Sequence, residues 1–242
     1  MNYYDIYQKR LNRFGKTYQE RLLGARKKSF DEYLEKSSYR VVFEYDYELH
    51  VGSFEKYKQD ETKTLHYLLT YLDLIMPNGT ILKIPDPNEP DKDEVWMVYY
   101  LESIQASGYN RYIMLRMSHF FTWKARDGEY YSTYAYLYGQ EDNMLKDEIR
   151  SRSRMDTIYA ENLKSSFFIA PVNPNINKDD YLIVGEKPLQ EYYRVTGYDR
   201  QSNIGIEFVT IDPVYEFDLT PPPAYAGEDP EKYYWFTGGE ND

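Results

Sequence analysis

The chain of 242 residues contains no cysteine. Disulfide bonds, a thiolate nucleophile and cysteine-ligated zinc are therefore excluded. No apolar run is long enough to span a bilayer. The N-terminal stretch "MNYYDIYQKRLNRFG" has no apolar signal-peptide core. These absences predict a protein that is made in the cytoplasm and does not associate with a membrane.

Residues that carry chemistry are also scarce. Only three histidines occur, without the spacing of paired metal ligands. The sequence has no Walker motif, no GxGxxG and no GxSxG. The carboxylates of the loop at 86–94 could hold a hard cation, but they lack the calcium-loop pattern, so a solvated loop is favoured. We expect no catalytic residue, no cofactor and no metal.

Tyrosine is abundant, with 29 residues in the chain. Strands favour aromatic residues, and tyrosine also suits interfaces, because its large apolar ring carries a polar end that tolerates water. Charge is unevenly distributed: residues 1–40 hold ten basic and five acidic side chains, whereas residues 201–242 hold one basic and nine acidic side chains. Such a basic front and acidic back can steer head-to-tail contacts between copies or partners, although ordinary solvated surface charge explains it equally well.

Apolar periodicity predicts a mainly β protein with minor α content. An N-terminal helical segment is expected over 1–37, divided into two or three short helices by Gly15 and Gly24. A main antiparallel β domain, barrel-like or sandwich-like, is predicted over 38–138. A linking helix over 139–160, a smaller second β unit over 161–218 and an extended C-terminal arm over 219–242 complete the organisation.

Within the main domain, the alternation of "YRVVFEYDYELHVGSF" predicts a strand. The stretch "ETKTLHYLLTYLDLIMPNG" fits either a helix or a strand, and the Pro-Asn-Gly turn after it favours the strand. The Asp127-Gly128 pair predicts a hairpin. Residues 81–117 and 182–211 share a pattern of apolar strand, aromatic-x-Val strand and apolar strand, consistent with two β-meanders or a decayed duplication.

Two clusters are candidates for docking to partners. One is a set of aromatic residues in the acidic, Pro/Gly-rich arm, which is typical of either a docking peptide or a loose tail. The other is the basic stretch at the end of the linking helix, where ion pairs with an acidic neighbouring subunit are favoured over nucleic-acid binding. The residues are Tyr233, Tyr234, Trp235 and Phe236 in the arm and Arg150, Arg152 and Arg154 in the helix.

The sequence resembles structural proteins of the head-to-tail neck of tailed bacteriophages, of the head-closure (stopper) type. The resemblance covers roughly residues 1–223. The segments that carry it are "GSFEKYKQDETKTLHYLLT", "PNGTILKI", "WMVYYLE", "GYNRYIMLRM", "YGQEDNMLKDEIRSRSR" and "YYRVTGYD…TIDPVY".

This resemblance implies a virion component without catalytic residues, made in the host bacterial cytoplasm. Copies would form a ring between the portal or adaptor protein on the head side and a tail protein on the other side. DNA would pass through the channel without sequence-specific binding, which suits the acidic net charge of −11. Two alternatives remain open: a tail-completion or other tail component, and a carbohydrate- or receptor-binding β module.

Overall fold

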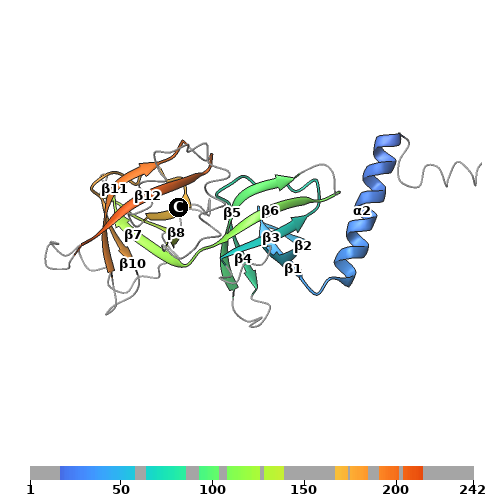
Figure 1. Ribbon diagram of the computed structural model, residues 1–242, viewed down its shortest axis with the longest axis horizontal. Coiled ribbons are helices and arrows are strands. Elements are labelled where there is room, and N and C mark those ends of the chain that lie inside the picture. The colour runs from blue at the N-terminus through green and yellow to red at the C-terminus, as the bar shows by residue number, and fades with distance from the viewer. Residues whose placement is uncertain are drawn as a thin grey trace, which may run out of the picture.

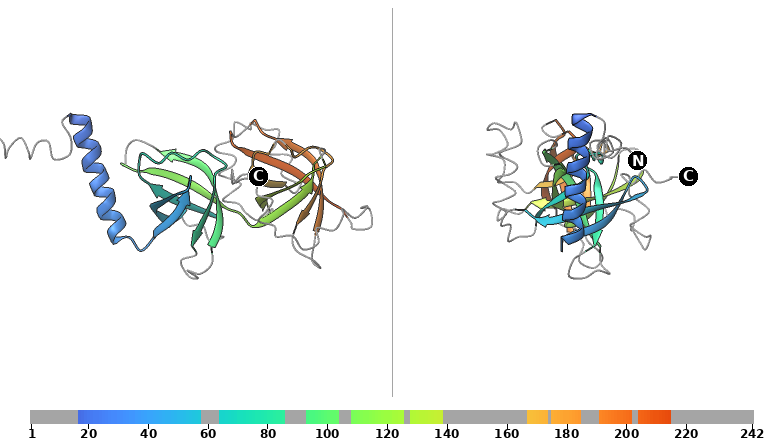
Figure 2. Two further views of the ribbon diagram at one scale, coloured as in Figure 1. Left: turned by 180° about the vertical axis from the view of Figure 1, so that it is seen from behind. Right: turned by 90° about the vertical axis from the view of Figure 1, so that its right-hand side faces the viewer.

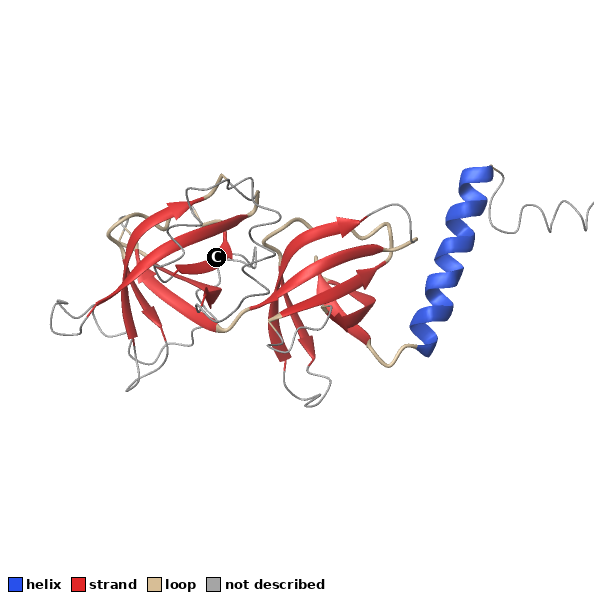
Figure 3. Ribbon diagram, in the orientation of Figure 1, coloured by secondary structure: helices blue, strands red, loops and turns tan. Residues whose placement is uncertain are grey.

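The computed structural model describes residues 17–57, 64–85, 93–103, 108–125, 128–138, 167–173, 175–184, 191–201 and 204–214. A single described helix and two antiparallel β units follow one another along the long axis (Figures 1 and 2). Strands dominate the described residues (Figure 3), and the predicted fold class, mainly β with minor α content, is confirmed. The linking helix over 139–160 and the arm over 219–242 lie outside the described residues.

The helix is α2 (Tyr18–Lys36). The first β unit contains β1 (Arg40–Tyr45), β2 (Glu48–Lys56), β3 (Leu65–Thr70), β4 (Ile81–Pro85), β5 (Asp93–Ser103) and β6 (Asn110–Arg116). The second contains β7 (His119–Lys124), β8 (Tyr130–Tyr138), β9 (Phe167–Pro171), β10 (Tyr181–Val184), β11 (Glu191–Asp199) and β12 (Ile206–Val214).

Helix α2 begins at a capping box. The side-chain oxygen of Thr17 accepts a hydrogen bond from the backbone N–H of Glu20, and the Glu20 carboxylate accepts one from the backbone N–H of Thr17. The helix continues to Lys36, so the predicted break at Gly24 is wrong. A single interior glycine costs about 1 kcal/mol relative to alanine. Good helix formers on both sides, and the burial of Phe30 and Leu34, offset that cost.

The first β unit is a six-stranded sheet in the order β1-β2-β3-β6-β5-β4, curled so that β1 lies against β4. The strand predicted for residues 65–70 is confirmed as β3. Large side chains fill the inside of the curl. They include Phe43, Phe54, Leu68, Trp96 and Met114. Helix α2 packs on the outside of this sheet, where Phe30 and Leu34 contact Leu69 and Val51.

The second unit is a closed barrel in the order β10-β11-β12-β9-β8-β7. The sequence interpretation assigned residues 119–138 to the main domain, but β7 pairs with β10 and β8 pairs with β9, so both strands belong to the barrel. With six strands, the second unit is not the smaller one. The reason is burial: Phe121, Trp123 and Ala135 point into the barrel core, where their apolar surface is removed from water.

The two units share a third hydrophobic core at their junction. It contains side chains from both. They include Leu65, Met97, Ile113 and Leu115 from the sheet and Phe167, Ile169, Ile206 and Phe208 from the barrel. The Pro77–Thr80 turn also reaches the barrel, because a Cβ on Gly79 would overlap the Gly205 carbonyl oxygen. Backbone therefore lies directly against backbone across the junction.

Candidate interaction surfaces

The seven docking candidates from the sequence cannot be placed. Tyr233, Tyr234, Trp235 and Phe236 of the arm, and Arg150, Arg152 and Arg154 of the linking helix, lie outside the described residues. Their docking role stays a prediction. Within the described part of the chain, exposed apolar side chains gather at two other places, one on α2 and one on the β1–β2 hairpin.

The first surface, the helix patch, consists of Tyr18, Leu22 and Leu23 in the first half of α2. Tyr18 is 74% exposed and Leu23 is 50% exposed. Leu23 precedes Phe30 by seven residues and so lies on the same stripe of the helix as the buried Phe30 and Leu34. The apolar stripe that packs α2 onto the sheet therefore continues past its last packed residue.

The contact between helix and sheet extends along α2 at least to Arg26. Gly108, in the turn before β6, adopts φ +83, and a Cβ there would meet the Cβ of Arg26 at 2.7 Å. Leu23 lies about one turn before Arg26 in the helix, and it is half exposed, whereas Phe30 and Leu34 on the same stripe are buried. Apolar periodicity alone does not show whether Leu22 and Leu23 pack within the chain or against another chain.

The second surface, the hairpin patch, consists of Val42, Tyr47 and Leu49. The sequence predicts one alternating strand here, but residues 46 and 47 form a two-residue turn in which Tyr45 pairs with Glu48. Asp46 and Tyr47 have φ 53 and 62, the left-handed values that such a hairpin turn requires. Because of the turn, Leu49 lies opposite Glu44 and not on the same face as Phe43 and Tyr45. Leu49 therefore points away from the core.

Side chains of the hairpin patch lie on the outer face of the sheet. Val42 pairs with Val51, which contacts α2, and Leu49 lies two residues before Val51 on the same face. Leu49 is 76% exposed and Tyr47 is 79% exposed. A tyrosine in the left-handed region carries a conformational cost that a glycine or asparagine would avoid. The hairpin therefore presents a large aromatic side chain at its tip despite that cost.

The two surfaces carry opposite charge. Residues 18–28 of α2 contain four basic side chains and one acidic side chain. Residues 44–48 of the hairpin contain three acidic side chains, all exposed, and no basic one. Each patch thus combines exposed apolar area with an excess of charge of one sign, the composition that gives both contact energy and orientation to an interface.

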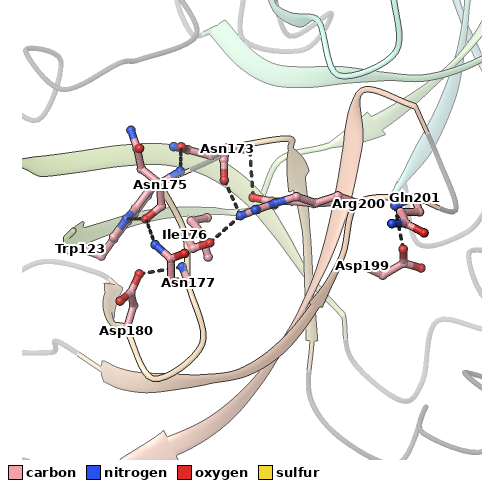
Figure 4. Close-up of polar contacts among 10 residues, drawn as sticks. Trp123, Asn173, Asn175, Ile176, Asn177, Asp180, Asp199, Arg200 and Gln201 are labelled. Atoms are coloured by element: carbon pink, nitrogen blue, oxygen red, sulfur yellow. Dashed lines mark hydrogen bonds and ion pairs between the residues drawn. The ribbon is translucent and has the colours of Figure 1, made fainter. Parts of the chain in front are cut away.

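A buried ion pair anchors the barrel beside the junction. The Glu207 carboxylate is fully buried; it accepts a 2.8 Å hydrogen bond from Arg200 Nε and one from the backbone N–H of Asn173. Arg200 also donates through Nη2 to the carbonyl oxygens of Asn173 and Ile176 (Figure 4). The guanidinium therefore holds the loop before β10 against the β11–β12 hairpin.

The same loop is tied internally by asparagine and aspartate side chains. The Asn173 side-chain oxygen accepts from the backbone N–H of Asn175, and Asp180 accepts from that of Asn177 (Figure 4). Trp123 of β7 donates from its indole nitrogen to the Asn175 carbonyl. In each of these hydrogen bonds the partner belongs to the same loop or to an adjacent strand of the barrel. These contacts therefore hold the loop in place on the barrel.

Glu207 makes stability depend on pH. Burial raises the pKa of Glu207 from 4.5 to about 7, and the Arg200 guanidinium offsets part of that rise. The folded protein thus keeps this proton to about pH 7, while the unfolded chain loses it near pH 4.5. The stability that the carboxyl contributes is complete below pH 4.5 and is lost as the pH rises to 7.

We therefore predict that the unfolding free energy of the wild-type protein falls relative to that of Glu207→Gln as pH rises from 4.5 to 7. The relative loss should reach about 3 kcal/mol, because one pKa unit corresponds to about 1.4 kcal/mol. Urea unfolding of both proteins at pH 4.5, 5.5, 6.5 and 7.5 measures it. Burial also lowers the pKa of His119, but that group titrates in both proteins and cancels in the difference. Parallel pH profiles would contradict the prediction.

No group of three or more His, Cys, Asp or Glu side chains that could hold a metal ion occurs among the described residues. The described part of the chain likewise contains no helix with the length and apolar character needed to cross a membrane. The predicted absence of catalytic residues, cofactor and metal stays a prediction.

No protein-family model matches the chain, and no curated protein matches it. Solved structures of MrkH, described as a c-di-GMP-dependent transcription regulatory factor, align with it. One is 6% identical, with a TM-score of 0.23 over 80% of this chain and 84% of that chain. MrkH of K. pneumonia in its apo state is 9% identical, with a TM-score of 0.24 over 80% of this chain and 85% of that chain. Similarity at this level carries no argument about function.

Proposed function

We propose that the chain is a structural component of a tailed phage virion, in the head-to-tail connector ring through which DNA passes. The observation that carries the proposal is the pair of exposed apolar patches of opposite charge on a protein with otherwise well-filled cores. A protein that works by assembly needs such surfaces, whereas a self-contained monomer leaves few large apolar side chains together in water. The assignment to the neck, with head-closure as its position, rests on the sequence resemblance.

A shared core at the junction supports the same proposal. A connector must keep its two neighbours at a fixed distance and orientation. The core between sheet and barrel, together with the Gly79–Gly205 backbone contact, holds the two units together. The proposed partners are further copies of this chain, a portal or adaptor protein and a tail protein. A net charge of −11 is compatible with DNA passing by without being bound.

We predict that the purified chain forms rings and that the virion carries it at the head–tail junction. Mass photometry and negative-stain microscopy test ring formation, and gold-labelled antibody on intact particles tests the position. Label at the tail tip, with binding on a glycan array, would favour the receptor-binding alternative instead. A chain that stays monomeric at high concentration and is missing from purified particles would refute the proposal.

A further inference from the structure

We infer that the helix patch of one copy docks on the hairpin patch of the next copy. This inference rests on the proposed ring, and it names the two surfaces that would build the ring. The occupant of each patch is thus a second copy of this chain, and the contact joins two different surfaces.

Charge is the first argument for this pairing. The segment of the helix patch contains Arg21, Arg26, Lys27 and Lys28 against one acidic residue, although Lys28 pairs with Glu32 and Lys27 lies over the Tyr71 ring. The segment of the hairpin patch contains exposed acidic residues at 44, 46 and 48. Two helix patches, or two hairpin patches, would place like charges against each other, which disfavours a symmetric contact. Helix against hairpin instead gives opposite charges at the rim and apolar side chains at the centre.

Shape and chemistry of the apolar groups are the second argument. Leu22 and Leu23 are flexible aliphatic side chains in the first half of α2. Tyr47 lies in a two-residue turn, and Val42 and Leu49 lie on the outer face of the strands behind it, where Val42 pairs with Val51 and Leu49 pairs with Glu44. A helix lying on this outer face would repeat the packing that α2 already makes on the same face of its own sheet, through Phe30 and Leu69.

The contact builds rings or filaments when each copy gives its helix to one neighbour and its hairpin to another. Such a heterologous interface repeats with each added copy, and the rotation between neighbours decides whether the assembly closes. In Figures 1 and 2, α2 lies at one end of the long axis, the barrel lies at the other end, and β1 and β2 belong to the sheet unit between them. Copies joined through α2 and the sheet unit would leave their barrels free to face another component of the neck.

The lack of cysteine allows a direct test in the full-length chain. Leu23→Cys and Leu49→Cys are made as separate variants, mixed, and treated with a short bismaleimide cross-linker. We expect a covalent dimer in the mixture, with a yield at least tenfold above that of either variant alone. The matched control mixes Leu23→Cys with Ile204→Cys, because Ile204 of the barrel is 88% exposed, comparable with the 76% of Leu49, the residue whose place it takes in the mixture. This pair should give the background yield.

A second variant separates docking from folding. Leu23→Glu places a carboxylate in the helix patch, and because Leu23 is half exposed its thermal melt should match that of the wild type when both are diluted to monomers. Association should weaken by about tenfold or more, the effect expected for an anchor at the centre of an interface. Unchanged association would contradict the inference.

Three outcomes would overturn the inference: equal yields in the mixture and the control, self-linking of Leu23→Cys as strong as the mixed yield, or linking only to other proteins within particles. Failure of the proposed function is distinguishable. If helix and hairpin cross-link but the assembly is an open filament, or the chain is missing from virions, the contact stands and the neck role fails. If rings form without this cross-link, the ring stands and the contact fails.

Discussion

Gly205→Ala is expected to lower the unfolding free energy by about 3 kcal/mol or more, the sum of left-handed strain and forced overlap at the junction. Gly205 has φ +86, and a Cβ there would overlap the carbonyl oxygen of Asn78 in the turn from the first unit. Because that atom belongs to the backbone, relief requires the two units to move apart. Such a movement would expose the shared core. Urea unfolding followed by tryptophan fluorescence measures the loss.

Gly128→Ala is the matched control. Gly128 has φ +91, but a Cβ there would meet nothing within 4 Å. This variant should therefore show only the conformational cost of a left-handed alanine, about 1–2 kcal/mol. If Gly205→Ala and Gly128→Ala were equally destabilised, the close contact between the turns would have no energetic role. Gly79→Ala should behave like Gly205→Ala, and the double variant should lose less than the sum, because both substitutions disrupt one contact.

Arg200→Met is expected to lower the unfolding free energy by about 3–5 kcal/mol at pH 8. The substitution leaves the fully buried carboxylate of Glu207 without its cation, and it removes the donors to the carbonyl oxygens of Asn173 and Ile176. Below pH 7 the Glu207 carboxyl is protonated in the fold, so the loss should be smaller at pH 5.5. Urea unfolding at the two pH values measures both effects.

Arg194→Met provides the control on the same strand. Arg194 lies in β11 and is exposed, so its replacement should change the unfolding free energy by less than about 0.5 kcal/mol. A comparable loss in both variants would mean that arginine content, and not the buried pair, determines stability. A loss in Arg200→Met that did not depend on pH would separate the role of its backbone contacts from that of Glu207.

Several features of the fold were predictable because they depend on local chemistry. The strand at 65–70 was predicted from the Pro-Asn-Gly turn that follows an ambiguous apolar pattern. Each of the two similar stretches, 81–117 and 182–211, forms three consecutive neighbouring strands, β4-β5-β6 and β10-β11-β12. The Pro-Asn-Gly turn was readable for the same reason, since Gly79 with φ +87 occupies a position that disfavours other residues. These features depend on residues within a few positions of one another.

Other features depend on partners distant in the sequence. The assignment of residues 119–138 to the barrel is decided by pairing with strands that are about 60 residues away for β7 and about 30 residues away for β8, which no local pattern encodes. Gly205 must be glycine because the Asn78 carbonyl oxygen lies where a Cβ would be. The partner of Glu207 is Arg200, a loop residue whose sequence context is that of an ordinary surface arginine. Sequence alone could not distinguish these residues from ordinary turn and surface positions.

The exposed patches show most clearly which properties follow from the sequence and which depend on the tertiary structure. By itself the sequence determined that the chain is mainly β, lacks cysteine, and carries a basic N-terminal and an acidic C-terminal region, because composition and short-range periodicity are sufficient for these properties. Only the tertiary structure decided that Leu23 and Leu49 face solvent while Phe30 and Phe43 are buried. An apolar side chain is buried only where the fold brings another surface to it, as it does at Phe30 but not at Leu23, which is half exposed.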